Sequence, residues 1–394
     1  MAGMEFLTGT IQNYDWGTSD GIADLLGRSP DGQPQAEYWL GAHPKSPSQV
    51  GDRPLDAVIA EDPAQLGEAS RQQFGDRLPY LMKILSAERA LSLQAHPSRA
   101  QAEEGYAREE EQGIAADARE RTYKDSWPKP EMIVSLGEMH ALCGFREPRA
   151  AADLFGGLGL ADRLSTVLGP LTERKGAAAL AETFLDALSL TGERAGLINE
   201  LLVAAVEHAQ DRGPVGEFAR TAIELDASYP GDPGILAALL LNRVTLEQGQ
   251  AIFLPAGNLH AYLRGTGVEI MANSDNVLRG GLTSKHIDVA ELTKVVDFSP
   301  YAPPILTPVE EAPGVRRYPT PAPEFALRCL DDVEAALPAE SSARILLVLD
   351  GSYTATGAAG ELTVAKGQSI YLPAGEQVRL AGAGTAFLAA HGIN

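Results

Sequence analysis

Gly249-Gln-Ala-Ile-Phe-Leu-Pro-Ala-Gly257 and Gly367-Gln-Ser-Ile-Tyr-Leu-Pro-Ala-Gly375 are two copies of one nine-residue segment. Seven positions are identical, and the two exceptions are Ala/Ser and Phe/Tyr. Each copy has the pattern of a turn, a short apolar strand and a Pro-Ala-Gly corner, which is typical of a small double-sheet barrel, or jelly roll. We therefore predict two such barrels in the chain.

The two copies diverge directly after the corner. The first continues as Asn258-Leu259-His260 and the second as Glu376-Gln377-Val378. Because a histidine can bind a metal and the second copy has none at this position, we expect the first barrel to carry the chemistry. The second barrel is expected to be structural.

The rest of the chain indicates a mainly β protein with a helical insertion. Short apolar runs bounded by turn residues predict strands at 78–85, 90–95 and 132–136. Residues 100–121 are rich in Ala, Glu and Arg and predict an exposed helix. Residues 149–228 predict a helical segment, since Leu197, Leu201 and Ala205 follow helical spacing. Strands are expected again after the Pro-Gly-rich stretch 229–234.

Four segments follow from these patterns, in keeping with a length of 394 residues, which exceeds the usual size of one core. Residues 1–148 and 229–305 are predicted to form the two parts of one jelly-roll barrel, the one expected to carry the chemistry. Residues 149–228 are expected to form a helical domain, and residues 306–394 a second, C-terminal jelly-roll barrel.

The overall charge argues against several classes of partner. Acidic residues outnumber basic ones by 53 to 32, which gives a formal charge of -21. Such a chain is a poor candidate for binding nucleic acid or an anionic membrane. Only two cysteines occur, Cys143 and Cys329, and no apolar stretch approaches the ~20 residues of a spanning helix. We expect a cytoplasmic protein that acts as a monomer.

Three segments offer candidate metal ligands. In Leu91-Ser-Leu-Gln-Ala-His-Pro97 a strand would place Ser92, Gln94 and His96 on one face. Glu131 follows a stiff Pro-Lys-Pro stretch, and His260 follows the corner of the first repeat. Two imidazoles and two oxygens suit zinc with an open coordination position. The residues alone equally fit a half-exposed strand and a surface strand start.

A further stretch, Gly267 to Lys285, offers groups for an anionic substrate. Glu269 lies between Val268 and Ile270 and is expected to face the barrel interior. Arg279, beside paired glycines, and Lys285 could hold a phosphate, the arginine through its bidentate fork. An ordinary loop with surface cations has the same pattern.

Six motifs together resemble type I phosphomannose isomerases, in that family's order over roughly residues 5–300. They are Asn13-Tyr-Asp-Trp-Gly17, Glu37-Tyr-Trp-Leu-Gly41, Leu93-Gln-Ala-His-Pro97, Lys129-Pro-Glu-Met132, Leu254-Pro-Ala-Gly257 with His260-Ala-Tyr-Leu263, and Ser274-Asp-Asn-Val-Leu-Arg279. The resemblance implies one Zn²⁺ per chain and a zinc-dependent isomerase that interconverts mannose 6-phosphate and fructose 6-phosphate through an enediolate.

The same resemblance implies roles for individual residues. The zinc ligands would be Gln94, His96, Glu131 and His260. Catalytic positions would be occupied by Arg279, Glu269 and Lys129, and substrate contacts by Lys83, Ser92 and Lys285. A cluster of Lys83, Lys129, Arg279 and Lys285 would then provide a basic site in an acidic protein.

Two other classes stay open at this point. An iron-dependent cupin oxygenase would use two histidines and one carboxylate, and here Gln94 and the cation set argue against it. A non-catalytic cupin that binds sugar phosphates would share the pocket but lack turnover. His43 could approach the site but is interpreted as structural.

Overall fold

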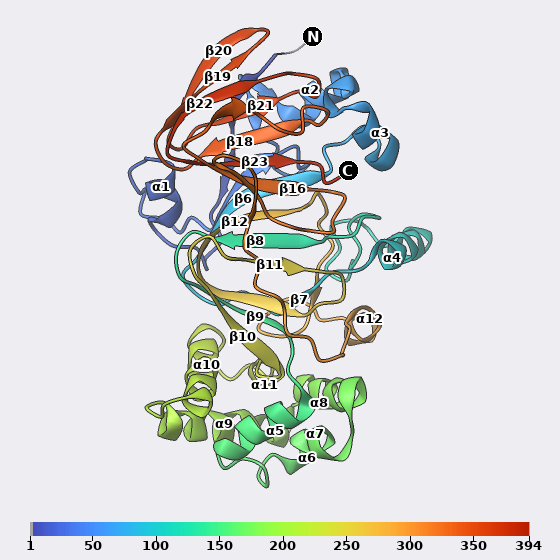
Figure 1. The fold of residues 1–394 in the computed structure, drawn as a ribbon. Coiled ribbons are helices and arrows are strands. Elements are labelled where there is room, and N and C mark those ends of the chain that lie inside the picture. Colours follow the sequence, from blue (N-terminus) through green and yellow to red (C-terminus); the bar gives the residue numbers. More distant parts are fainter. Residues whose placement is uncertain (1–2, 394) are drawn as a thin grey trace.

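Three β-sheets and a group of helices build the molecule (Figure 1). The computed structural model describes residues 3–393 of the chain. The C-terminal strands lie at one end in Figure 1, the helices α5 to α11 lie at the other, and the sheet that carries the candidate site lies between them. Within the described residues no helix is long and apolar enough to cross a membrane.

The central sheet has ten strands, with β12 paired to four others. Its strands are β2 (Thr10–Gln12), β3 (Glu37–Gly41), β6 (Tyr80–Ala87), β7 (Gln94–Ala95), β8 (Glu131–Ser135), β9 (Met139–Phe145), β10 (Leu241–Leu246), β11 (Ala251–Leu254), β12 (His260–Ala272) and β13 (Leu278–Arg279). Because β12 is 13 residues long, its first half pairs with β7 and β9 and its second half with β6 and β8. Strand β12 therefore carries two of the candidate site residues, His260 in its first half and Glu269 in its second.

A nine-stranded sheet joins the start of the chain to its end. Its strands are β1 (Glu5–Thr8), β4 (Gln49–Val50), β5 (Arg53–Pro54), β14 (Val309–Ala312), β15 (Val315–Arg317), β16 (Ala326–Asp331), β18 (Arg344–Val348), β21 (Ser369–Leu372) and β23 (Thr385–Ala390). A four-stranded sheet contains β17 (Glu334–Ala336), β19 (Ser352–Gly357), β20 (Gly360–Ala365) and β22 (Arg379–Ala383). The pairing of β1 with β21 places N-terminal residues beside the C-terminal strands.

Apolar side chains from the two large sheets form one core. Tyr80 and Met82 of β6 and Ile345 of β18 belong to the same buried cluster. The buried Tyr80 hydroxyl donates to the carbonyl oxygen of Ala343 at 3.1 Å, which satisfies its polar group. The C-terminal strands thus form a rigid support behind the central sheet.

The two repeat copies have the same local conformation in different sheets. Gly249 and Gly367 have φ values of +80° and +79°, which favour glycine. Each copy then forms a strand, β11 in the central sheet and β21 in the nine-stranded one, and ends at a corner glycine with φ near +80°. The turn, strand and corner predicted for each copy are confirmed.

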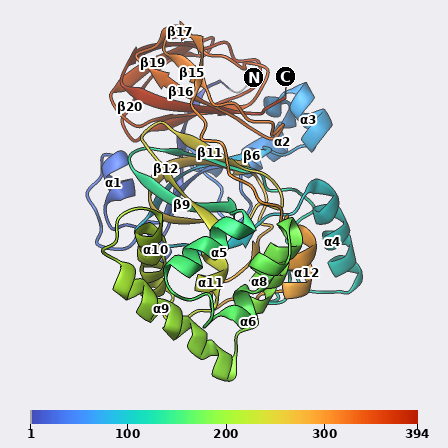
Figure 2. The ribbon, with the colours of Figure 1, turned by 60° about the horizontal axis from the view of Figure 1, so that its bottom comes forward.

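Seven helices pack together at one end of the molecule, and Figure 2 shows several of them from below. They are α5 (Pro148–Gly157), α6 (Ser165–Leu168), α7 (Pro170–Glu173), α8 (Gly176–Leu188), α9 (Gly196–His208), α10 (Pro214–Ser228) and α11 (Gly234–Ala238). The other elements are α1 (Gly21–Leu25), α2 (Leu55–Glu61), α3 (Glu68–Phe74), α4 (Arg99–Glu111), α12 (Val289–Val295) and the 3₁₀ turns η1 (Pro63–Leu66) and η2 (Gly192–Ala195). Helix α9 confirms the spacing-based prediction for residues 197–205.

Three local predictions were wrong. The helix expected over 100–121 is α4, which ends at Glu111 because Gly113 takes a left-handed φ of +70°. The strands expected after residue 234 are preceded by α11, all five of whose residues are buried. The strand expected near 90–95 is limited to Gln94–Ala95, because Leu91 and Leu93 donate their amides to Tyr262 and Gly281 in separate segments.

Candidate metal centre and substrate cavity

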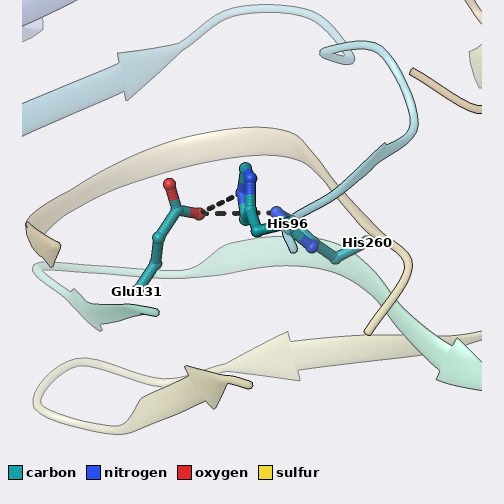
Figure 3. A group of neighbouring side chains, drawn as sticks. All are labelled: His96, Glu131 and His260. Atoms are coloured by element: carbon teal, nitrogen blue, oxygen red, sulfur yellow. Dashed lines mark ion pairs between the residues drawn. The ribbon is translucent and has the colours of Figure 1, made fainter. Parts of the chain in front are cut away.

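Three buried side chains from three segments converge at one point, as Figure 3 shows. The Nε2 atoms of His96 and His260 lie 3.2 and 3.5 Å from the same oxygen, Oε2 of Glu131. Possible ligand atoms of the three residues all lie within 4.8 Å of one another. Two imidazoles and a carboxylate at this separation form a set that zinc uses in open, catalytic sites.

The first repeat copy explains why these residues meet. Strand β11 pairs with β8 so that Leu254 faces Glu131, and the chain then turns at the corner before β12 begins at His260. The amide of the corner residue Gly257 donates to the carbonyl oxygen of His96 at 2.8 Å. The corner therefore contacts one histidine and leads directly to the other.

Backbone carbonyl groups orient both imidazole rings. Nδ1 of His96 lies 2.8 Å from the carbonyl oxygen of Asn276, and Nδ1 of His260 lies 3.1 Å from that of Asn258. A carbonyl oxygen can only accept, so each ring carries its proton on Nδ1 and presents the lone pair of Nε2 to Glu131. This second contact is typical of histidines that bind metals.

The His96 side chain fits a metal in two further respects. Burial lowers the pKa of His96 to about 4, so the imidazole is neutral at physiological pH, as a metal ligand must be. Its Nε2 is buried without a hydrogen-bond partner, although such buried polar atoms are normally satisfied. A cation bound between the three residues would satisfy this atom.

Gln94 lies next to this cluster. In the strand pairing it faces His260 of β12 on one side and Arg279 of β13 on the other. Paired residues of neighbouring strands project to the same side of a sheet, and Gln94 and Arg279 both line the adjoining cavity. The backbone thus places the expected fourth ligand beside a member of the cluster.

Lys129 forms an ion pair with the other oxygen of the Glu131 carboxylate. Its Nζ lies 3.0 Å from Oε1, and both side chains are buried. Burial alone raises the pKa of Glu131, but the side chains around it, among them the Lys129 ammonium, outweigh burial and hold that pKa well below its usual range. The carboxylate is therefore ionised, and its negative charge largely balances the positive charge of Lys129.

A second buried ionic group surrounds Lys83. Its Nζ lies 3.1 Å from Glu269 and 3.5 Å from Glu37. Burial lowers the pKa of Lys83, but the two carboxylates outweigh burial and hold it well above its usual range. The Tyr262 hydroxyl donates to Glu269 and the Trp39 indole N–H donates to Glu37, at 3.0 and 2.7 Å. Lys83 is thus already paired before any ligand binds.

A cavity of about 680 Å³ opens above these groups. Ser92, Lys83, Lys129, Arg279 and Lys285 all line it. Glu269, His96, Glu131 and His260 are buried and do not. The cavity volume lies in the range of small-molecule sites.

Arg279 and Lys285 differ from the other two cations of the site. Within residues 3–393 neither side chain forms an ion pair with a carboxylate, and the Arg279 guanidinium lowers the pKa of Lys285 by charge repulsion. Burial also lowers the pKa of Arg279. Two neighbouring, uncompensated cations in a cavity provide a site for a dianion such as phosphate.

Sequence reasoning missed two residues that line the cavity, Glu37 and Lys45. Glu37 is an isolated acid in the otherwise apolar buried strand β3, and that contrast was an available signal. His43, interpreted as structural, lies with its Nε2 3.4 Å from Asp275. Lys45 pairs with the same carboxylate at 2.8 Å, and both partners contribute to a pKa of Asp275 held well below its usual range, against burial.

Comparison with known proteins adds independent findings. A family model for the catalytic domain of type I phosphomannose isomerases matches residues 4–148. The mannose-6-phosphate isomerase of Escherichia coli (strain K12) is 37% identical over 384 residues, 95% of each chain. That of Rattus norvegicus is 32% identical and covers 95% of this chain and 94% of its own length. A crystal structure of the Salmonella typhimurium enzyme bound to fructose 6-phosphate and zinc superposes with a TM-score of 0.89, at 33% identity, over 99% of this chain and 100% of that one.

Proposed function

This chain belongs to the type I phosphomannose isomerases, and from that premise we propose that it is a zinc-dependent isomerase of mannose 6-phosphate and fructose 6-phosphate. Support comes from relatives over nearly the full length and from a neighbour whose structure holds zinc and fructose 6-phosphate. The observation that carries the proposal on this chain is the unpartnered Nε2 of buried His96 beside Glu131 and His260.

We assign the metal to His96, Glu131 and His260, with Gln94 as the fourth ligand. When bound there, zinc would supply Lewis acidity for the oxygens of the sugar, where negative charge develops in the enediolate. Lys129 holds Glu131 in its ionised form and lines the cavity, so its ammonium is close to where that charge develops. An iron-dependent oxygenase would need only two histidines and one carboxylate. It would not explain the nearby cations Arg279 and Lys285, which suit a phosphate.

We assign the substrate phosphate to Arg279 and Lys285, whose charges are uncompensated. The positive charges of Lys83 and Lys129 are balanced by carboxylates. We therefore assign these two lysines a smaller part in phosphate binding than Arg279 and Lys285. This arrangement would explain how a protein of charge -21 can bind an anion: the two cations with uncompensated charges both line the cavity.

Glu269 is proposed to act through Lys83. Its carboxylate does not line the cavity, whereas Lys83, 3.1 Å away, does. To act on a carbon of the sugar, Glu269 would first accept a proton from the Lys83 ammonium, and the neutral Lys83 amine would then accept the proton that leaves the carbon; the reverse steps would return a proton to the neighbouring carbon. Ser92, half-buried in the same wall, is assigned to a hydroxyl of the sugar.

We also propose the finer architecture. The central sheet, which takes its strands from residues 1–148 and 229–305, forms the cupin barrel of the active site, and residues 149–228 form the helical domain. Residues 306–394 form the second cupin-like barrel, to whose nine-stranded sheet β1, β4 and β5 of the first segment are added. The conformation of the two repeat copies supports this division. A monomeric, cytoplasmic enzyme remains our prediction.

Turnover with and without metal tests the function. Purified protein should convert mannose 6-phosphate to fructose 6-phosphate, lose activity on chelation and regain it with zinc. His96→Ala should bind little zinc while keeping the fold by circular dichroism. If zinc-loaded, folded protein gave no turnover but bound the sugar phosphate, the non-catalytic binding alternative would replace the proposal.

A further inference from the structure

Asn276 is a fully buried residue whose side-chain amide bonds to a single neighbouring segment. Its Oδ1 accepts the backbone amides of Lys124 and Asp125, at 2.7 and 3.3 Å. Its Nδ2 donates to the carbonyl oxygens of Asp125 and Trp127, at 2.7 and 2.8 Å. An amide has two donors and two acceptor positions, so its hydrogen-bonding capacity is used entirely on residues 124–127.

The backbone of Asn276 contacts the metal centre. Its carbonyl oxygen lies 2.8 Å from Nδ1 of His96 and so fixes the tautomer and orientation of that ring. The segment held by the side chain continues directly into Lys129 and Glu131. Asn276 therefore contacts one candidate ligand through its main chain and the segment that carries another through its side chain.

The reverse contacts make this connection reciprocal. The Asp125 carboxylate accepts the Ser274 hydroxyl at 2.8 Å and the Asp275 amide at 2.9 Å. The Trp127 ring also forms cation–π contacts, since the guanidinium groups of Arg77 and Arg99 lie 4.6 and 4.2 Å from its centroid. Satisfied networks of buried polar groups rigidify the segments that they join.

We propose that Asn276 is a positioning residue of the zinc site, which fixes the distance between His96 and Glu131 by tying the 274–276 turn to the 124–127 segment. This inference rests on the proposed zinc assignment. The same turn leads three residues later to Arg279, which faces Gln94 across β13 and β7. Asn276 thus also sets the phosphate-binding cation relative to the metal.

Two substitutions test the side chain without removing the carbonyl group that contacts His96. Asn276→Asp keeps the size of the side chain and the oxygen that accepts the Lys124 amide. It replaces the NH2 group that donates to two carbonyl oxygens. Asn276→Ala removes all five side-chain hydrogen bonds to residues 124–127. The matched control is Asn273→Ala, three residues away in the chain: Asn273 is also buried, but its amide donates to Leu78 and forms no hydrogen bond with residues 124–127.

Zinc affinity of the apo protein, measured by competition with a chelator, is the main readout. Both Asn276 variants should bind zinc about 10- to 100-fold more weakly, the range for residues that orient metal ligands, while Asn273→Ala stays within about threefold of the parent. The visible spectrum of the Co²⁺-substituted protein should change in the Asn276 variants alone. In the loaded enzymes kcat should fall more than KM rises.

The melting temperature of each apo protein separates positioning from folding. Unchanged zinc affinity and Co²⁺ spectrum in folded Asn276 variants would overturn the inference. If neither variant folds, Asp125→Asn, which weakens the same network from its other side, takes their place with the same readouts. If His96→Ala also binds zinc like the parent, the zinc assignment itself fails; if only the Asn276 variants do, the positioning role alone fails.

Discussion

Replacing Lys83 by methionine isolates the energetics of the buried ionic group. Lys83, Glu37 and Glu269 are each exposed by less than a tenth, and the single ammonium compensates two carboxylates. Methionine retains most of the volume and the apolar stem but leaves both acids without a counter-charge. Removing one partner of a buried pair costs about 3–5 kcal/mol, because the remaining charge stays desolvated.

The size of the effect on melting follows from chain length. An unfolding entropy of about 2.1 cal/mol/K per residue over 394 residues gives about 0.8 kcal/mol/K. A loss of 3–5 kcal/mol therefore lowers the melting temperature by roughly 4–6 °C. A control is Arg53→Met, which breaks the exposed pair between Arg53 and Glu61 and should cost less than about 1 kcal/mol.

The loss should depend on pH with a defined sign. Burial raises the pKa of Glu269 even with Lys83 present, and removing the lysine raises it further. A folded-state pKa above the unfolded one means that the folded protein binds the proton more tightly, so stability falls as pH rises through that range. Lys83→Met should therefore be much less destabilising near pH 5 than near pH 8.

Differential scanning calorimetry of both variants at the two pH values makes the measurement. Adding Glu269→Gln to Lys83→Met should recover part of the loss near pH 8, because one uncompensated charge is removed. The reasoning is refuted if Lys83→Met costs no more than Arg53→Met, or if its cost is the same at both pH values.

Two further predictions concern the phosphate site and the repeat. Lys285→Ala should raise the KM for mannose 6-phosphate by roughly 10- to 100-fold at similar kcat, since a hydrogen bond to a charged group contributes about 1.5–3 kcal/mol; steady-state kinetics with an unchanged KM would contradict the assignment. Arg279→Lys should keep the charge but lose the fork, and so lower kcat/KM at unchanged zinc content. Gly249→Ala should cost about 1–2 kcal/mol from its left-handed backbone alone, because nothing lies within 4 Å of the added Cβ. Gly367→Ala should cost more, since its Cβ would lie 2.2 Å from the carbonyl oxygen of Leu26; equal costs in urea denaturation would show that this contact relaxes.

Local patterns predicted several elements correctly because their causes are local. The repeat copies carry glycines where the backbone needs a positive φ, and helix α9 carries apolar residues at helical spacing. Apart from the end of α4 at Gly113, which has a local cause, predictions were wrong where the deciding contacts are distant in sequence. Helix α11 is stabilised by burial against α8 and α10, and the short strand β7 by its two partners β12 and β13.

The sequence by itself determined which residue types were available for the site. The motifs around His96, Glu131 and His260 indicated the metal set, and Arg279 with Lys285 indicated an anion site. These inferences depend on residue chemistry and on motif order, both of which are readable along the chain.

Only the tertiary structure decided which charges are free. Lys83, Lys129, Arg279 and Lys285 are equivalent cations in the sequence, but the pairing of β6 with β3 and β12 places Lys83 opposite Trp39 and Glu269, beside Glu37. Lys129 is paired with its neighbour Glu131, whereas among residues 3–393 neither Arg279 nor Lys285, which both line the cavity, forms an ion pair with a carboxylate. Apart from the local pair of Lys129 and Glu131, charge compensation depends on distances of 3–4 Å between segments far apart in the chain, and that information exists only once the sheet has formed.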